Sequence, residues 1–93
     1  MATRSPSKAP VRSVHRAENQ LVVGVLRTLR EKAGFTQVAF AEKLGRTQSY
    51  VSSAERGAKL DTLQIRDWCL ACGSDLVSWA KAVEKALTSN SSG

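Results

Sequence analysis

The sequence predicts an all-α protein with five short helices and a flexible segment at each end. Apolar residues recur at intervals of three and four, which is the period of one helical face. Residues that favour helix starts and helix stops flank each of these apolar segments. No segment alternates apolar and polar residues as a half-buried strand would, so we predict no β-sheet.

The first predicted helix and the start of the second are the clearest elements. The apolar residues of the first helix share one face and are Leu21, Val22, Val25, Leu26 and Leu29. Gly34 follows as the predicted stop, because glycine adopts the left-handed conformation that often ends a helix. Thr36 is the predicted N-cap of the second helix, since its hydroxyl can accept from a free backbone N–H.

The later helices are delimited by the same types of residue. The predicted N-caps of the third, fourth and fifth helices are Thr47, Asp61 and Ser74 or Asp75. The predicted stops of the second, third and fourth helices are Gly45, Gly57 and Gly73. Trp68 lies on the apolar stripe of the fourth helix and is a predicted core residue.

The two ends of the chain differ in composition from the body. Residues 1–16 contain both prolines and four basic residues, with no acidic residue. Such a segment buries too little apolar surface to offset the entropy lost on ordering. We therefore predict a disordered basic arm over residues 1–17, a folded domain over 18–87 and a polar tail over 88–93.

Composition excludes several classes of protein. The 93 residues carry a net charge of +6. They include a single histidine and only eight scattered carboxylates, so few catalytic arrangements are possible, and we predict neither an enzyme nor a cofactor. No apolar stretch approaches the roughly 18 residues that span a bilayer. The first residues lack the apolar segment of a secretory signal, so we expect a cytoplasmic protein that does not associate with membranes.

Residues 36–57 carry the most informative pattern. A tight turn between two helices makes them cross steeply, which requires a small residue at the crossing. Ala41 meets this requirement, Gly45 follows four residues later at the turn, and Val51 follows six further on as a buried aliphatic residue. The combination predicts a helix-turn-helix.

These residues resemble the Cro/C1-type (XRE-family) helix-turn-helix regulators, which include the DNA-binding domains of lambdoid phage repressors. The resemblance spans about residues 21–79 and includes the matching segments at residues 30–37, 55–57 and 71–73. It implies a five-helix, lambda-repressor-like fold in a bacterial or phage protein associated with the nucleoid. Departures at Arg46, Tyr50, Leu60-Asp61 and Cys72 leave the DNA target open.

The resemblance also implies roles for individual residues. In such proteins the second helix of the motif enters the major groove. The implied base-reading residues are Gln48, Ser49, Tyr50 and Ser53. Gln48 suits adenine, and Tyr50 has a second reading as a shield of the helix–helix contact. The implied phosphate contacts are Gln37, Arg46, Thr47, Arg56 and Lys59.

Other residues are expected to act in structure or assembly. Relatives form an internal salt bridge at the positions of Arg30 and Glu55. Many dimerise through their C-terminal region, which makes Trp79, Val83 and Leu87 candidates for a dimer interface; Trp79 packed on its own chain is the alternative. Cys69 and Cys72 form a C-x-x-C at the end of a helix, and we expect buried, reduced thiols and no metal site.

The predicted function is a transcriptional regulator that binds a pseudo-palindromic, double-stranded DNA operator as a homodimer. Repression is the commoner use in the resembling family. Two alternatives stay open: an antitoxin-type DNA-binding protein that also neutralises a toxin, and a helical protein-interaction module with only non-specific DNA affinity. A protein partner such as a toxin or RNA polymerase is compatible with these readings.

Overall fold

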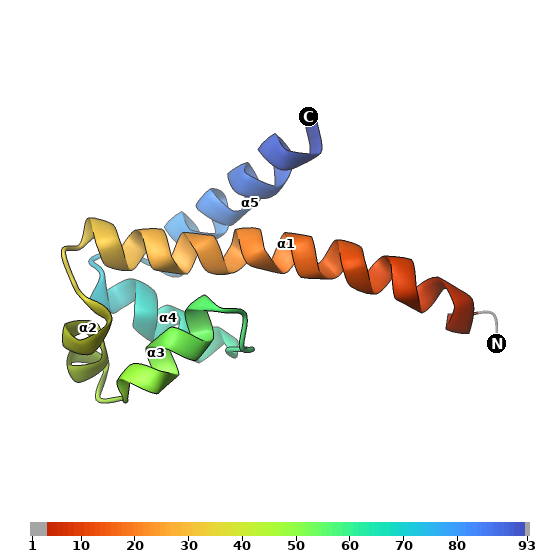
Figure 1. Ribbon diagram of the computed structural model, residues 1–93. Helices are drawn as coiled ribbons and strands as arrows, with labels where there is room; N and C mark the ends of the chain where they lie inside the picture. Colours follow the sequence, from red (N-terminus) through yellow and green to blue (C-terminus); the bar gives the residue numbers. More distant parts are fainter. Residues whose placement is uncertain (1–3, 93) are drawn as a thin grey trace.

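The computed structural model describes residues 4–92, and the side chains of residues 17–89. The described residues form five helices and no strand (Figure 1), which confirms the predicted all-α class. The helices are α1 (Arg4–Lys32), α2 (Gln37–Leu44), α3 (Gln48–Glu55), α4 (Thr62–Ala71) and α5 (Leu76–Ser92). In Figure 1, α2, α3 and α4 gather on one side of the C-terminal half of α1, and α5 lies on the other side.

The first and last helices are longer than the sequence predicts. Helix α1 begins at Arg4, within the predicted arm, and α5 continues to Ser92, through the predicted tail. Apolar periodicity locates only the part of a helix that packs, because polar residues beyond it carry no pattern. Side chains of residues 1–16 and 90–93 lie outside the described residues, so the flexibility of both ends and the boundaries at 17 and 88 stay predictions.

The predicted caps are present at the middle three helices. The hydroxyl of Thr36 accepts from the backbone N–H of Ala39, and the hydroxyl of Thr47 accepts from that of Tyr50, both at 3.1 Å. Asp61 forms a reciprocal capping box with the side chain of Gln64. These bonds satisfy N–H groups that a helix start leaves free.

The turn between α2 and α3 has the predicted geometry. Gly45 has a φ of 71°, and its N–H bonds to the carbonyl oxygens of Ala41 and Glu42. A side chain at this φ would strain the backbone, so glycine permits the short connection to Thr47.

The core lies between α1 and the three central helices. Phe40 of α2, Val51 of α3 and Trp68 of α4 are fully buried. The rings of Phe40 and Trp68 meet edge to face with centroids 4.8 Å apart, and the indole N–H of Trp68 donates to the carbonyl oxygen of Leu26 at 3.0 Å. Ala41 is buried in the same cluster as Val51 and Ala54 of α3, as expected of a small residue between the two helices, and the predicted core position of Trp68 is confirmed.

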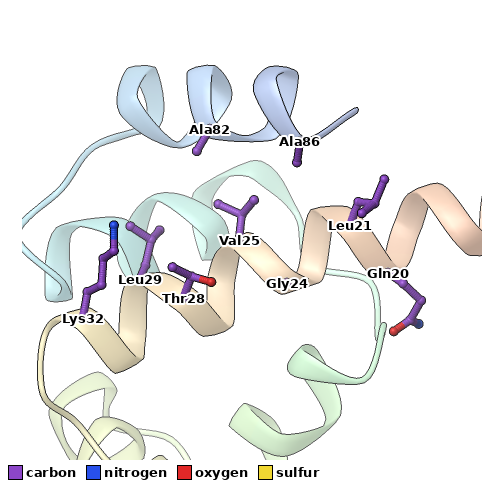
Figure 2. Close-up of a pocket in the computed structure, with 9 residues that line it drawn as sticks. All are labelled: Gln20, Leu21, Gly24, Val25, Thr28, Leu29, Lys32, Ala82 and Ala86. Carbon is purple, nitrogen blue, oxygen red and sulfur yellow. The ribbon is translucent and has the colours of Figure 1, made fainter. Parts of the chain in front are cut away.

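The buried face of α1 matches the predicted one only in part, since Leu26 is buried as predicted. Among its described side chains, those buried are Val23, Leu26 and Arg30. Leu21, Val25 and Leu29 are only half-buried. They line a groove of about 360 Å³ between α1 and α5, across which α5 presents Ala82 and Ala86 (Figure 2). The alanines are too short to fill this space, and for that reason the predicted stripe is not fully covered.

Candidate nucleic-acid interface

The start of α3 presents its side chains away from the core. Val51 and Ala54 are buried on the inner face of this helix, whereas Gln48 and Ser49 are exposed at its N-terminal end. Because residues three and four apart share a helical face, the inner face fixes which side chains point outward. Ser53 follows Ser49 by four residues and is half-exposed.

Sequence reasoning missed one member of this outer face. Ser52 follows Ser49 by three residues and Gln48 by four, and its side chain is half-exposed, as that of Ser53 is. Helical spacing alone would have identified it. The outer face of α3 therefore consists of Gln48, Ser49, Ser52 and Ser53, and the serines are short enough to allow this helix a close approach to a groove.

A chain of hydrogen bonds connects the interior to Gln48. The Nε and Nη2 atoms of Arg30 donate to the carboxylate of Glu55 at 2.6 and 3.1 Å. The amide of Gln37 donates to the same carboxylate at 3.0 Å. The amide of Gln48 donates to the side-chain oxygen of Gln37 at 3.4 Å. The contact between Gln48 and Gln37 is the longest of these hydrogen bonds and is therefore the weakest link of the chain.

The ion pair at the inner end of this chain is buried. The side chains of Arg30 and Glu55 are 8% and 5% exposed. Arg30 also donates to the carbonyl oxygen of Phe35 at 2.7 Å, which ties it to the connection between α1 and α2. The hydrogen bond to Glu55 raises the pKa of Arg30 above its ordinary value, against the opposing effect of burial. The predicted salt bridge is thus present, and it joins the first and third helices.

Arg46 and Tyr50 form a pair at the edge of α3. The guanidinium carbon of Arg46 lies 4.7 Å from the centroid of the Tyr50 ring, within the range of a cation–π contact. The ring packs against the hydrophobic core, and its burial raises the pKa of the Tyr50 hydroxyl. These contacts support the reading of Tyr50 as a shield of the helix contact.

The other predicted phosphate-contacting residues surround α3. Gln37 is the first residue of α2 and Thr47 caps α3, so both lie at helix N-termini. Arg56 and Lys59 are exposed in the loop that follows α3. The side-chain amide of Asn19 donates to the carbonyl oxygen of Gly57 in this loop at 3.3 Å. Asn19, which sequence reasoning did not identify, thereby holds the loop against α1.

The predicted dimer residues lie on α5. Trp79 is half-buried and packs against the core of its own chain, as its alternative reading expected. Val83 and Leu87 are half-buried further along the same helix. Their role in dimerisation stays a prediction.

The two cysteines are free thiols, as predicted. Cys69 is buried and Cys72 is half-buried. Burial raises the pKa of both thiols, that of Cys72 to about 11. The thiolate is the reactive form and the metal ligand, so both residues are poor nucleophiles at neutral pH. In the part of the chain that the structure describes, no three His, Cys, Asp or Glu side chains lie close enough together to hold a metal ion.

Comparison with known proteins agrees with this geometry. A family model described as a helix-turn-helix domain matches residues 22–79. An XRE-family like protein from Pseudomonas syringae pv. tomato str. DC3000 is 32% identical, with a TM-score of 0.71, over 82% of this chain and 94% of that chain. The clp gene regulator ClgR from C. glutamicum is 21% identical and shares the fold, with a TM-score of 0.67, over 74% of this chain and 90% of that chain. A search of curated proteins gave no match.

The fold and the exposed face of α3 define a DNA-binding helix-turn-helix protein. The chain belongs to the XRE-type family of helix-turn-helix transcription regulators. None of the described helices is both long enough and apolar enough to cross a membrane.

Proposed function

We propose that this regulator binds a pseudo-palindromic operator as a homodimer and represses transcription from it. Each subunit places α3 in the major groove of one half-site. The two half-site centres lie about one helical turn, roughly 34 Å, apart. Repression follows where the operator overlaps a promoter, because the bound dimer then occupies the DNA that RNA polymerase needs.

The observation that carries this proposal is the exposure of Gln48 and Ser49 at the start of α3, a helix whose inner face is buried in the core. Val51 and Ala54 are 0% and 1% exposed, so α3 is held rigidly on its inner face. A rigid helix that presents hydrogen-bonding side chains at its N-terminal end suits the reading of base edges in the major groove.

The proposed contacts divide into two groups. Gln48 is the principal base reader, and Ser49 and Ser53 add hydrogen bonds of lower selectivity; Ser52 joins them because it shares their face. The proposed phosphate contacts are Gln37, Arg46, Thr47, Arg56 and Lys59. Phosphate contacts release counterions, so binding weakens steeply as the salt concentration rises.

The proposed dimer contact involves Val83 and Leu87 of α5. Both side chains keep part of their apolar surface exposed in the single chain. Trp79 contributes less, since it already packs against its own core. Sedimentation equilibrium on Val83→Glu and on the matched exposed-face variant Lys81→Glu tests this contact. Only Val83→Glu is expected to shift the protein towards monomer, and equal behaviour of the two variants would place the interface elsewhere.

Selection of bound duplexes from a random DNA pool, at about physiological salt, tests the proposal as a whole. We expect enrichment of an inverted repeat whose half-site centres are about 10 base pairs apart. Binding without any enriched sequence would contradict operator recognition and leave a basic module held by phosphates. Enrichment of a single, unrepeated half-site would contradict the dimer.

A further inference from the structure

We propose that the groove between α1 and α5 binds a single-chain alkyl carboxylate, with its alkyl chain on the apolar walls and its carboxylate at Lys32. The groove is separate from the DNA-reading face, because α5 and the α2–α4 helices lie on opposite sides of α1 (Figure 1). The inference therefore goes beyond the proposed function and does not depend on the roles proposed for α3.

The walls of the groove are apolar. Helix α1 contributes Leu21, Val25 and Leu29, and α5 contributes Ala82 and Ala86 across from them (Figure 2). The three larger side chains are only half-buried in the folded chain, so apolar surface stays in contact with water along the groove. An alkyl chain laid on this surface would remove it from water, which favours binding in proportion to the area covered.

Gly24 keeps the groove open at its centre. Glycine is unfavourable in the interior of a helix, yet a Cβ atom at this position would meet no neighbouring atom within 4 Å. Its φ is not positive, so neither a close contact nor a special backbone conformation accounts for this glycine. Together with Ala82 and Ala86 on the other wall, it leaves a volume of about 360 Å³, which lies within the range of small-molecule sites.

Lys32 gives the groove a charge at one end. Among the described residues that line the groove, Lys32 alone is charged, and it takes part in none of the ion pairs of the described side chains. Figure 2 shows it on the same side of α1 as Leu29, at the end of the helix. Its aliphatic stem can continue the apolar wall while its ammonium group stays in water. A carboxylate placed there would meet a positive charge, whereas a cationic head group would be repelled.

The dimensions of the groove favour an alkyl chain over a second copy of this protein. A helix with its side chains is about 10–12 Å across, which is too wide to enter a hollow of about 360 Å³. An extended alkyl chain is much narrower and can follow α1 from Leu21 to Lys32, a rise of about 16 Å along the helix axis. The ligand class is therefore a fatty acid of medium chain length.

Isothermal titration calorimetry with laurate, below its micellar concentration, tests the proposal. We expect one laurate per chain, and octanoate should bind at least about tenfold more weakly because it buries fewer methylenes. Dodecyltrimethylammonium has the same chain as laurate with the opposite charge and should bind at least about threefold more weakly. Association of many molecules per chain, alike for the two head groups, would show detergent-like binding and would overturn the proposal.

Two pairs of variants locate the bound chain and its head group. Gly24→Leu fills the groove with a residue that favours helix and should weaken laurate binding at least about tenfold, whereas Ala80→Leu, on the exposed side of α5, should bind as the wild type does. Lys32→Gln should weaken laurate about threefold and abolish its advantage over the cation. Lys81→Gln, at an exposed position outside the groove, should preserve both affinities. Thermal melts followed by circular dichroism would establish that each variant is folded.

The contrary outcomes are distinct from one another. Equal laurate affinities of the wild type, Gly24→Leu and Ala80→Leu would place binding outside the groove and overturn the proposal. Absence of laurate binding by the wild type would also overturn it, and a shift of Gly24→Leu towards monomer in sedimentation equilibrium would then assign the groove to a second copy. A failure of the wild type to select any DNA sequence would overturn the proposed function and leave this inference intact.

Discussion

Arg30 of α1 and Glu55 of α3 form a buried two-point ion pair, with N–O distances of 2.6 and 3.1 Å across 25 residues of sequence. The pair fixes the third helix to the first, and Gln37 extends it to the exposed end of α3. A structural contact in the interior thus borders directly on the proposed DNA-reading surface.

Removal of one partner of this pair is expected to destabilise the fold strongly. Glu55→Ala removes the main counter-charge of the buried Arg30 guanidinium and leaves only the more distant carboxylate of Glu31, at 3.9 Å. Loss of one partner of a buried pair costs about 3–5 kcal/mol of unfolding free energy in comparable cases. Urea denaturation of the wild type and the variant measures the loss.

The double variant Arg30→Met/Glu55→Leu is the control, because it replaces both charges with apolar groups. It should be less destabilised than Glu55→Ala, since no unpaired charge remains in the interior. A double variant as unstable as the single one would mean that shape, and not charge pairing, governs this position.

Enlargement of Ala41 is expected to force α2 and α3 apart. Ala41 is 3% exposed at the crossing of the two helices, so Ala41→Leu should cost about 1–3 kcal/mol through overpacking. Ala39 lies on the exposed side of the same helix, and Ala39→Leu should stay within about 0.5 kcal/mol of the wild type. Thermal melts followed by circular dichroism would compare them; equal losses would disprove a tight crossing.

Base-reading and phosphate-contacting residues are expected to differ in how they weaken binding. Gln48→Ala should cost about 1–3 kcal/mol at the operator and relax the preference at one base pair in each half-site. Lys59→Ala should weaken operator and random DNA alike and lower the slope of log K against log salt by about one. Anisotropy titrations at several salt concentrations measure both effects. If the two variants lose affinity equally on both DNAs, the assigned roles are wrong.

The stability of the fold is expected to fall in alkaline solution, in part because of Cys72. Burial raises the pKa of this thiol from 9.0 to about 11. A raised folded-state pKa means that the native state holds the proton more tightly than the unfolded state. The resulting stabilisation is complete below about pH 9 and is lost as the pH rises through 11.

The Cys72→Ala variant isolates this contribution. Its unfolding free energy, measured by urea denaturation from pH 8 to 11, should decline less steeply than that of the wild type, because the variant lacks the thiol. Other titrating groups affect both proteins equally. Parallel curves for the two proteins would show that Cys72 does not couple protonation to folding.

The helix-turn-helix was predictable because its constraints are local. Thr36, Gly45 and Thr47 act on backbone groups within a few residues of themselves, so their types indicate where helices begin and end. A turn as short as that between α2 and α3 requires the two helices to pack closely, and this requirement predicts a buried small residue at Ala41. The ion pair between Arg30 and Glu55 was predicted from the family resemblance alone, since no local pattern relates two positions so far apart in the sequence.

Contacts between distant segments were not predictable from local patterns. The periodicity of α1 indicated an apolar stripe that includes Leu21 and Val25, yet in the folded chain Val23 is buried and Leu21 and Val25 are only half-buried. The contact of Asn19 with Gly57 and the bond from Gln37 to Glu55 join separate elements. The sequence around a single polar residue does not indicate which distant residue it will bond to, so these contacts can be identified only in the folded structure.

The most direct test of the central claim, that the start of α3 reads base sequence, is selection from one random DNA pool by the wild type and by Gln48→Ala in parallel. We expect the wild type to enrich an inverted repeat with a strong adenine preference at one position of each half-site. We expect Gln48→Ala to enrich the same repeat with that position relaxed. Identical enriched sequences for both proteins would show that Gln48 does not read a base and would contradict the account.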